Sequence, residues 1–351
     1  MKIAILGDTH FGARNDLKLF HDFFAKFYVD TFIPYLIENE IDTVIQLGDL
    51  FDRRKYVNYY TLSECKRYFF DQLEKNNITL HTLVGNHDIY WRESLEVNSS
   101  SLVLGEYNCV NVHTKPATIS RNKTTFDIIP WICPENEAEI IEFIKNSKSD
   151  ICVGHFEIAG FAMYRGMEAH DGIDRSIFEK FEQVWSGHYH TKSRKDNITY
   201  VGTPAEMTWQ DYADPKGFHT FDLDTRKLEF IPNPNTIFVR VEYDDSVGNM
   251  VDLDALNLKD KYVKLIVVKK TDYYKFDKFM NKLYNKGCYE IKIIEDLSEF
   301  SDGEVGEEIN LEDTVSVLSN YIDSIETDMD KEKVKTFMRT LYTEAINSTE
   351  V

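Results

Sequence analysis

Polar side chains of the types that bind metal ions occur in five short blocks, and each block begins directly after a glycine. They comprise two carboxylates, one amide and five imidazoles: Asp8, His10, Asp49, Asn86, His87, His155, His188 and His190. One metal ion does not need so many donors, whereas two ions that share a bridging carboxylate do. Mixed nitrogen and oxygen donors suit Mn, Fe or Zn better than Mg or Ca. The pattern therefore predicts a centre of two divalent metal ions.

The five blocks each follow an apolar run, and these runs predict buried strands over residues 2–7, 43–47, 79–84, 150–153 and 183–185. Helical patterns over 17–40 and 60–75 separate the first three strands. This alternation implies parallel strands with right-handed crossovers. Ligands of such sheets bind beyond the carboxyl ends of the strands, so the blocks should meet at one rim. The preceding glycines supply permissive backbone for the sharp turns that aim each ligand.

In order, the blocks resemble the motifs of the calcineurin-like metallophosphoesterases: Asp8-x-His10, Gly48-Asp49-x-x-Asp52, Gly85-Asn86-His87-Asp88, Gly154-His155 and Gly187-His188-x-His190. The resemblance implies an α/β fold of two packed mixed β-sheets flanked by helices. It also implies a role for each ligand. Asp8, His10, Asp49 and His190 would hold one metal ion, and Asp49, Asn86, His155 and His188 would hold the other. His87 would face the substrate as the catalytic group, with a metal-activated hydroxide as nucleophile.

Within this family, the GDLFD and GNHD motifs at 48–52 and 85–88 resemble the SbcD-type DNA-repair nuclease subunits, including those of T-even-type phages. The resemblance implies a Mn-dependent DNA exonuclease and single-strand endonuclease. It further implies an SMC-like coiled-coil ATPase as partner, and a homodimer of this subunit within a heterotetramer. The corresponding processes are double-strand-break processing, recombination and recombination-dependent replication.

Two other functions stay open from the residues themselves. One is a small-molecule phosphodiesterase or phosphatase, and the other is a mainly structural subunit that binds DNA ends. Two further acidic residues of the motifs also have two interpretations. Asp52 and Asp88 either hold metal ligands in place from behind or are plain turn residues.

Changes in composition predict four parts of the chain. Residues 1–235 would form the nuclease domain, which ends at a Pro-Asn-Pro-Asn break. Residues 236–295 predict a small α/β cap for DNA recognition, and 296–310 an acidic linker. Residues 311–351 predict a helical tail.

The cap and the tail each carry a stripe of side chains with two possible uses. In the cap, the helix expected over 272–286 has four lysines on one face: Lys275, Lys278, Lys282 and Lys286. They either follow a DNA backbone or form the solvated face of an amphipathic helix. The tail has an apolar stripe that either packs on the nuclease domain or binds the root of the ATPase coiled coil: Val334, Phe337, Met338, Leu341 and Tyr342.

The net charge of −20 weighs against nucleic-acid binding by bulk charge. However, residues 296–351 hold 15 acidic and 4 basic side chains, a net of −11, so the other 295 residues carry only −9. No apolar run reaches the roughly 20 residues that span a membrane. Five widely spaced cysteines without a CxxC motif predict neither disulfides nor structural zinc. We therefore expect a reducing cytoplasm, that of the host if a phage encodes the chain.

Overall fold

The computed structural model describes residues 1–164, 167–168, 172–247 and 250–295, and the single helical positions Ile322, Lys331 and Val334. Residues 1–295 form one compact unit and residues 296–351 a second one. The predicted acidic linker and most of the predicted tail, including Phe337, Met338, Leu341 and Tyr342, lie outside the described residues. In the part of the chain that is described, no helix has the length and apolarity needed to cross a bilayer.

The first sheet has six strands in the order β14-β13-β1-β2-β3-β4. The strands β1 to β4 run parallel, whereas β13 is antiparallel to β1 and β14 is antiparallel to β13. The bounds are β1 (Lys2–Leu6), β2 (Thr43–Gln46), β3 (Thr79–Leu83), β4 (Val110–His113), β13 (Gly217–Asp222) and β14 (Leu228–Pro232). The predicted parallel strands are thus confirmed, within a sheet whose edge is antiparallel.

The second sheet also has six strands, in the order β11-β12-β10-β7-β6-β5. Its four central strands are parallel, and both edge strands are antiparallel. The bounds are β5 (Ala117–Arg121), β6 (Thr124–Ile129), β7 (Ile151–Gly154), β10 (Gln183–Ser186), β11 (Ser193–Lys195) and β12 (Ile198–Tyr200). A short separate pair consists of β8 (Ala162–Tyr164) and β9 (Met167–Glu168).

The two sheets pack face to face around one buried apolar cluster. Strand alternation sends Ile3 and Ile5 of β1 into this cluster, while Ala4 and Leu6 point to the opposite face. The second sheet contributes Val153 and the fully buried Trp185. Each Å² of apolar surface buried at this interface contributes about 25 cal/mol to the stability of the fold. The predicted sandwich of two mixed sheets is therefore confirmed.

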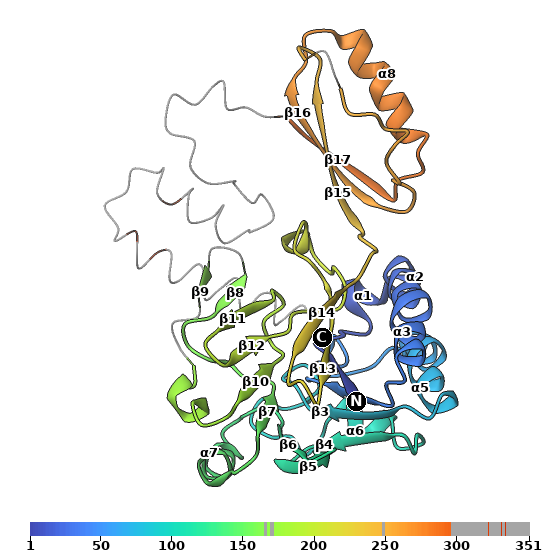
Figure 1. Cartoon of the computed structure of the whole chain (residues 1–351). Coiled ribbons are helices and arrows are strands. Elements are labelled where there is room, and N and C mark those ends of the chain that lie inside the picture. The colour runs from blue at the N-terminus through green and yellow to red at the C-terminus, as the bar shows by residue number, and fades with distance from the viewer. Residues whose placement is uncertain are drawn as a thin grey trace. The chain divides into compact units, whose positions relative to one another are not determined.

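Helices cover the outer faces of both sheets, and Figure 1 shows α2, α3 and α5 on one side of the first sheet. The two predicted long helices exist, and each contains a π-helical turn whose aromatic side chains meet in the core. The rings of Tyr28 and Tyr68, one from each turn, stack with centroids 5.6 Å apart. The first helical stretch is α1 (Ala13–Asp16), α2 (Lys18–Phe27), η1 (Tyr28–Phe32) and α3 (Ile33–Glu38). The second is α4 (Tyr59–Cys65), η2 (Lys66–Phe70) and α5 (Asp71–Lys75).

Several elements between residues 90 and 245 were not predicted from the sequence. They include the strands β4, β5, β6 and β11, and four short helices: α6 (Ser99–Val103), α7 (Glu137–Asn146), η3 (Arg175–Phe178) and η4 (Trp209–Asp211). The helix α7 buries Ile140 and Ile144 against the second sheet. These elements complete the second sheet and its cover, and none of them carries a predicted metal ligand.

A small α/β unit follows the sandwich, as predicted for the cap. It is a parallel sheet in the order β15-β16-β17 with α8 packed on it. The bounds are β15 (Phe238–Asp244), β16 (Tyr262–Lys269), α8 (Tyr273–Tyr284) and β17 (Glu290–Glu295). Asp272 caps α8 by accepting from the backbone N–H groups of Tyr274 and Lys275. Because α8 ends at Tyr284, Lys286 lies beyond the helix and not on its face, which corrects the expected span 272–286.

A histidine pair at the first sheet makes the stability depend on pH. His81 Nδ1 lies 3.1 Å from His113 Nε2. Burial, then the neighbouring His81, lowers the pKa of His113 to about 4, and burial lowers the pKa of His81. Unfolded histidine titrates near 6.5, so between pH 4 and 6.5 the unfolded chain binds more protons than the folded chain. The contribution of this pair to the free energy of unfolding is therefore fully present above pH 6.5, and it is lost as the pH falls from 6.5 to 4.

We predict that His113→Gln reduces the loss of unfolding free energy between pH 7 and pH 5 by about 1 kcal/mol, because the variant no longer takes up that proton on unfolding. Urea denaturation at both pH values measures the difference. Asn111→Gln, on the same strand, serves as the control and should keep the wild-type loss. An equal loss in His113→Gln and wild type would contradict the prediction.

Candidate metal centre

The structure brings all eight predicted residues to one rim, at the carboxyl ends of five strands. The first sheet contributes Asp8 and His10 after β1, Asp49 after β2, and Asn86 and His87 after β3. The second sheet contributes His155 after β7, and His188 and His190 after β10. Both carboxylates therefore come from the first sheet, and three of the eight side chains reach them from the second sheet.

Three of the candidate ligands have a left-handed backbone, which is strained for residues with a side chain. The φ angles are 42° at His10, 50° at Asp49 and 84° at His188. Among the preceding glycines only Gly48 has a positive φ, of 91°. A Cβ on Gly187 would lie 2.4 Å from Asp8 Oδ1, so this glycine is needed for close approach. The expectation that all five glycines supply conformational freedom is thus wrong for four of them.

Asp8, His10 and His190 form the first group of potential ligands, with their ligand atoms within 4.8 Å of one another. His10 Nε2 and His190 Nε2 are 3.1 Å apart. Two nitrogens that each bind an ion at 2.0–2.1 Å lie about 3 Å apart at neighbouring positions of a coordination shell. The spacing therefore fits two imidazoles that bind the same ion.

Asp49, His155 and His188 form the second group, again within 4.8 Å. The side-chain oxygen of Asn86 joins them, at 2.9 Å from His155 Nε2 and 3.1 Å from His188 Nδ1. Asp49 also faces the first group, because its Oδ2 lies 3.3 Å from His155 Nε2 and 3.8 Å from His10 Nε2. A carboxylate between two groups of imidazoles fits a bridging ligand, so the donor set is suited to two divalent ions.

The pKa values of three imidazoles, those of His10, His188 and His190, suit metal binding, which requires neutral nitrogen. Burial, then nearby positive charge, lowers the pKa of His188 to about 3, and burial lowers that of His190 to about 4. Burial also holds the pKa of His10 well below its usual value. Burial and the nearby charge on Asp49 raise the pKa of Asp8 to about 7, although His155 opposes them. A cation between the two carboxylates would relieve their repulsion.

His155 is oriented by a group that the sequence analysis did not single out. Its Nδ1–H donates to the carbonyl of Leu47 over 2.7 Å, which leaves Nε2 as the ligand atom. Burial lowers the pKa of His155, but Asp49 and Asp8 outweigh burial and raise it to about 9. The ring of Trp131 packs on this side, with centroids 5.8 Å from His155 and 5.2 Å from His188.

His87 lies beside the ligands and is held by the backbone. Its Nδ1–H donates to the carbonyl of Asp52 over 2.6 Å, and its ring packs edge-on against His10 at 4.9 Å. A ring nitrogen of His87 is also within 4.8 Å of the ligand atoms of His10 and Asp49. Burial lowers the pKa of His87, but the Asp49 charge and the bond to Asp52 raise it above 6.5. The Asp49 charge and the bond to Asp52 therefore favour the protonated form of this imidazole.

Asp88 and Asp52, the two acidic residues with open interpretations, both contact the ligand loops. Asp88 is fully buried and accepts from the backbone N–H groups of Leu50, Phe51 and Gly85 at 2.9–3.3 Å. It therefore joins the loop after β2 to the loop after β3. Asp52 Oδ1 lies 3.4 Å from His10 Nδ1. This geometry favours ligand support for both residues over plain turn roles.

Two further supports lay outside the sequence analysis. The buried Gln46 side chain donates to the carbonyl of Gly48 over 2.5 Å and accepts from the Gly48 N–H over 3.1 Å. Lys216, itself buried, donates to the His190 carbonyl over 2.9 Å and forms an ion pair with Asp211 at 2.7 Å. A glutamine at the end of a buried strand is the sequence signal that could have indicated the role of Gln46. No local signal indicates the role of Lys216, because this role depends on a tertiary contact.

The cap lysines differ from one another in their partners. Lys282 and Lys286 both lie 2.6 Å from the carboxylate of Asp254. Lys275 lies 3.8 Å from Asp272, and Lys278 lies over the ring of Tyr274 at 5.9 Å. Asp254 therefore compensates the charges of Lys282 and Lys286. This leaves Lys275 and Lys278 as the stronger candidates for a phosphate contact.

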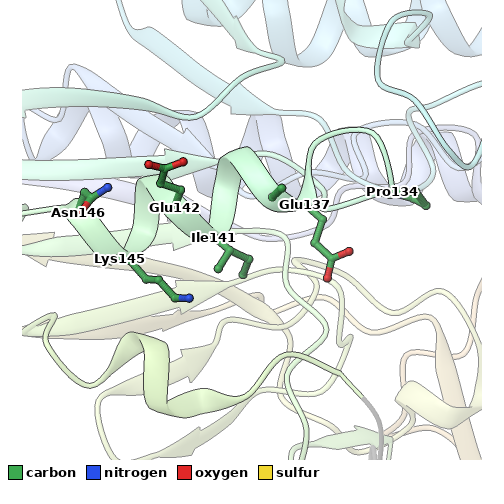
Figure 2. A pocket seen from close by; sticks show the side chains of 7 residues that line it. Pro134, Glu137, Ile141, Glu142, Lys145 and Asn146 are labelled. Carbon is green, nitrogen blue, oxygen red and sulfur yellow. The ribbon is translucent and has the colours of Figure 1, made fainter.

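A separate pocket lies along α7, as Figure 2 shows, and its lining includes Glu137, Ile141, Glu142 and Lys145. None of the eight predicted metal-centre residues lines it. This pocket is therefore separate from the candidate centre, whose position is given by its ligand atoms.

Comparison with known proteins gives the family. Residues 1–192 match the calcineurin-like phosphoesterase model. The chain belongs to the calcineurin-like phosphoesterases. As a member of this family it is a phosphoester hydrolase that uses divalent metal ions, and the two-group ligand set is the matching feature of its structure.

Relatives of this phosphoesterase include two curated proteins. It is 35% identical over 350 residues to exonuclease subunit 1 of Enterobacteria phage T4, which covers 98% of this chain and 99% of the relative. It is 23% identical over 315 residues to the DNA double-strand break repair protein Mre11 of Nanoarchaeum equitans, covering 81% and 83%. A solved archaeal phosphodiesterase covers 66% of this chain and 99% of its own, with 12% identity and a TM-score of 0.35.

The ligand geometry predicts how single substitutions change metal content. Wild type stripped with a chelator should take up two Mn ions per chain. Asp49→Ala should retain at most a weakly bound ion, because Asp49 faces both groups, whereas His155→Ala should retain one. Metal analysis after gel filtration measures the stoichiometry. His21→Gln, a histidine that bonds to Thr61 outside the centre, should still bind two. Two tightly bound ions in Asp49→Ala would show that Asp49 is not the bridging ligand.

Proposed function

We propose that this phosphoesterase is the nuclease subunit of a DNA-processing complex and that it cleaves DNA phosphodiesters, as an exonuclease and a single-strand endonuclease, at a two-metal centre. The observation that carries the proposal is the position of Asp49, which belongs to the second ligand group and faces His10 of the first, with His87 beside both. The near full-length similarity to a phage exonuclease subunit and the weaker similarity to Mre11 support DNA as the substrate.

Two divalent ions, most consistent with Mn, would supply positive charge to a phosphate and an activated water as nucleophile. Asp8, His10, Asp49 and His190 would hold one ion, and Asp49, Asn86, His155 and His188 the other. The bond to the Asp52 carbonyl holds the His87 ring, and the raised pKa of His87 favours its protonated form. His87 would therefore protonate the leaving oxygen or donate a hydrogen bond to the developing charge. The surrounding packing covers the ligand side chains, since Asp8, His10, Asp49 and His155 are at most 2% exposed.

We predict that His87→Ala lowers DNA cleavage by about 10²- to 10⁴-fold, the usual effect of a general acid. The test measures cleavage of end-labelled single- and double-stranded DNA with Mn, alongside the metal content of each protein. The variant should still bind two ions, which separates loss of the acid from loss of the centre. Equal cleavage by the variant would exclude a catalytic role for His87. If wild type cut no DNA but hydrolysed a small phosphodiester, the nuclease proposal would be wrong.

The cap, residues 236–295, is proposed to contact the DNA backbone through Lys275 and Lys278. Both lie on α8, which buries Phe279, Met280 and Leu283 in the cap core on its other face. A lysine that neutralises one phosphate contributes about 0.9 to the salt dependence of duplex binding. The local positive charge acts at short range, within a Debye length of about 10 Å, despite the net charge of the chain.

We predict that Lys275→Gln with Lys278→Gln lowers the slope of log affinity against log salt by about 1–2 for duplex DNA. Lys282→Gln with Lys286→Gln is the matched control, and its slope should change less because Asp254 already pairs with both lysines. Fluorescence anisotropy with Ca in place of Mn measures binding without cleavage. Identical slopes for the first double variant and wild type would remove these lysines from the DNA-binding surface.

The partner is proposed to be an SMC-like coiled-coil ATPase, bound through the tail 311–351 that follows the linker 296–310. The relative from phage T4 is named as a subunit, which supports a complex of this kind. Val334 of the apolar stripe lies in a helix and is half-buried. The proposed assembly is a homodimer of this subunit within a heterotetramer in the cytoplasm, where the five free cysteines would stay reduced.

A further inference from the structure

Two large aromatic side chains are exposed in the loop after β3, a few positions after His87. Tyr90 is 43% exposed and Trp91 49% exposed. Of the four tryptophans, all of them within the described residues, Trp91 is the exposed one, whereas Trp185 is completely buried. Exposed aromatic pairs of this size mark contact sites more often than single apolar residues do.

The pair projects from a base that is firmly held. Asp88 and Ile89 are fully buried, and Ile89 packs with Leu95 from the other side of the loop. Backbone hydrogen bonds close the loop from Ser99 N to the Asp88 carbonyl at 2.8 Å and from Tyr90 N to the Val97 carbonyl at 3.0 Å. The rings of Tyr90 and Trp91 pack edge to face at 5.1 Å, which restricts their orientations. The exposed rings are thus preorganised and do not result from a loosely packed loop.

The pair also lies close to the centre. Trp91 is four positions after His87 in the chain, so their Cα atoms are at most about 15 Å apart. The Asp52 carbonyl that accepts from His87 is followed in the chain by the basic residues Arg53, Arg54 and Lys55. Tyr56, the next residue, is 54% exposed and its ring lies 5.0 Å from the Arg53 guanidinium. Exposed aromatic rings thus occur in both loops that contain or contact His87, and one of these loops also carries three basic residues.

We propose that Tyr90 and Trp91 form a stacking platform for the bases of an unpaired DNA strand whose phosphodiester is cleaved at the adjacent centre. The inference rests on the proposed nuclease function and names the form of DNA that the site prefers. Aromatic rings bind bases of any sequence through their π-faces, while basic side chains follow the backbone. In an intact duplex the base faces are covered by neighbouring base pairs, so a ring can stack only on a base that is unpaired or frayed. The platform thus selects single strands and open ends.

The test compares two substrates in the full chain with Mn: a single-stranded oligonucleotide and methyl p-nitrophenyl phosphate, a diester without a base. The double variant Tyr90→Ala with Trp91→Ala should lower the ratio of kcat/KM for the oligonucleotide to that for the small diester by about tenfold or more. Trp91→Phe should restore part of the ratio, because it keeps an aromatic ring. Leu102→Ala, which removes an exposed apolar side chain from α6, should keep the wild-type ratio.

A spectroscopic measurement supports the kinetic one. An oligonucleotide with 2-aminopurine near the scissile position should lose fluorescence on binding to wild type with Ca, and should lose much less with the double variant. An unchanged ratio together with equal quenching would overturn the stacking platform. If wild type cut no DNA at all, the proposed function itself would fail, which is a different result from a nuclease that is indifferent to Tyr90 and Trp91.

Discussion

The rest of the structure depends on the interaction between the buried carboxylate of Asp49 and the two groups of imidazoles on either side of it. A buried charge is costly unless neighbours compensate it. Here the compensation comes from His155, from the backbone N–H of His87 at 2.7 Å and, in the proposed function, from two metal ions. His155, His188 and His190 come from the second sheet, whereas Asp49 and His10 come from the first. The face-to-face packing of the sheets therefore serves to bring together partners that no single sheet supplies.

Buried polar groups behind the ligands keep this arrangement in place. Asp88 accepts backbone hydrogen bonds from the loops after β2 and β3, and the Leu47 carbonyl orients His155. These contacts give a physical account of the left-handed backbone at Asp49, because the bonds to the adjacent Leu50 and Phe51 stabilise the strained turn. The ligands are consequently held in position by a network of hydrogen bonds between the loops that carry them.

Charge also has to be considered locally. The chain has a net charge of −20, but the rim holds buried side chains that can bind cations, and Arg53, Arg54 and Lys55 follow Asp52, whose carbonyl accepts from His87. In the cap, two of four lysines are compensated by Asp254, so a stripe counted from the sequence overstates the available positive charge. The aromatic pair after His87 adds a contact that does not depend on charge. Together these features favour a substrate recognised mainly at the point of cleavage.

The sequence by itself determined the five ligand blocks, the strands that precede them and hence the fold family, because each strand is a short apolar run ended by a polar block. It also indicated the cap helix, whose apolar and basic residues alternate with a helical period. The edge strands β4, β5 and β11 were missed because their half-exposed residues lack a strong apolar run. Only the tertiary structure placed Asp49 between both imidazole groups, showed which glycines serve close approach, and revealed Gln46, Lys216 and the Asp254 ion pairs. These are contacts between segments distant in the chain, and no local pattern encodes the partner of a side chain.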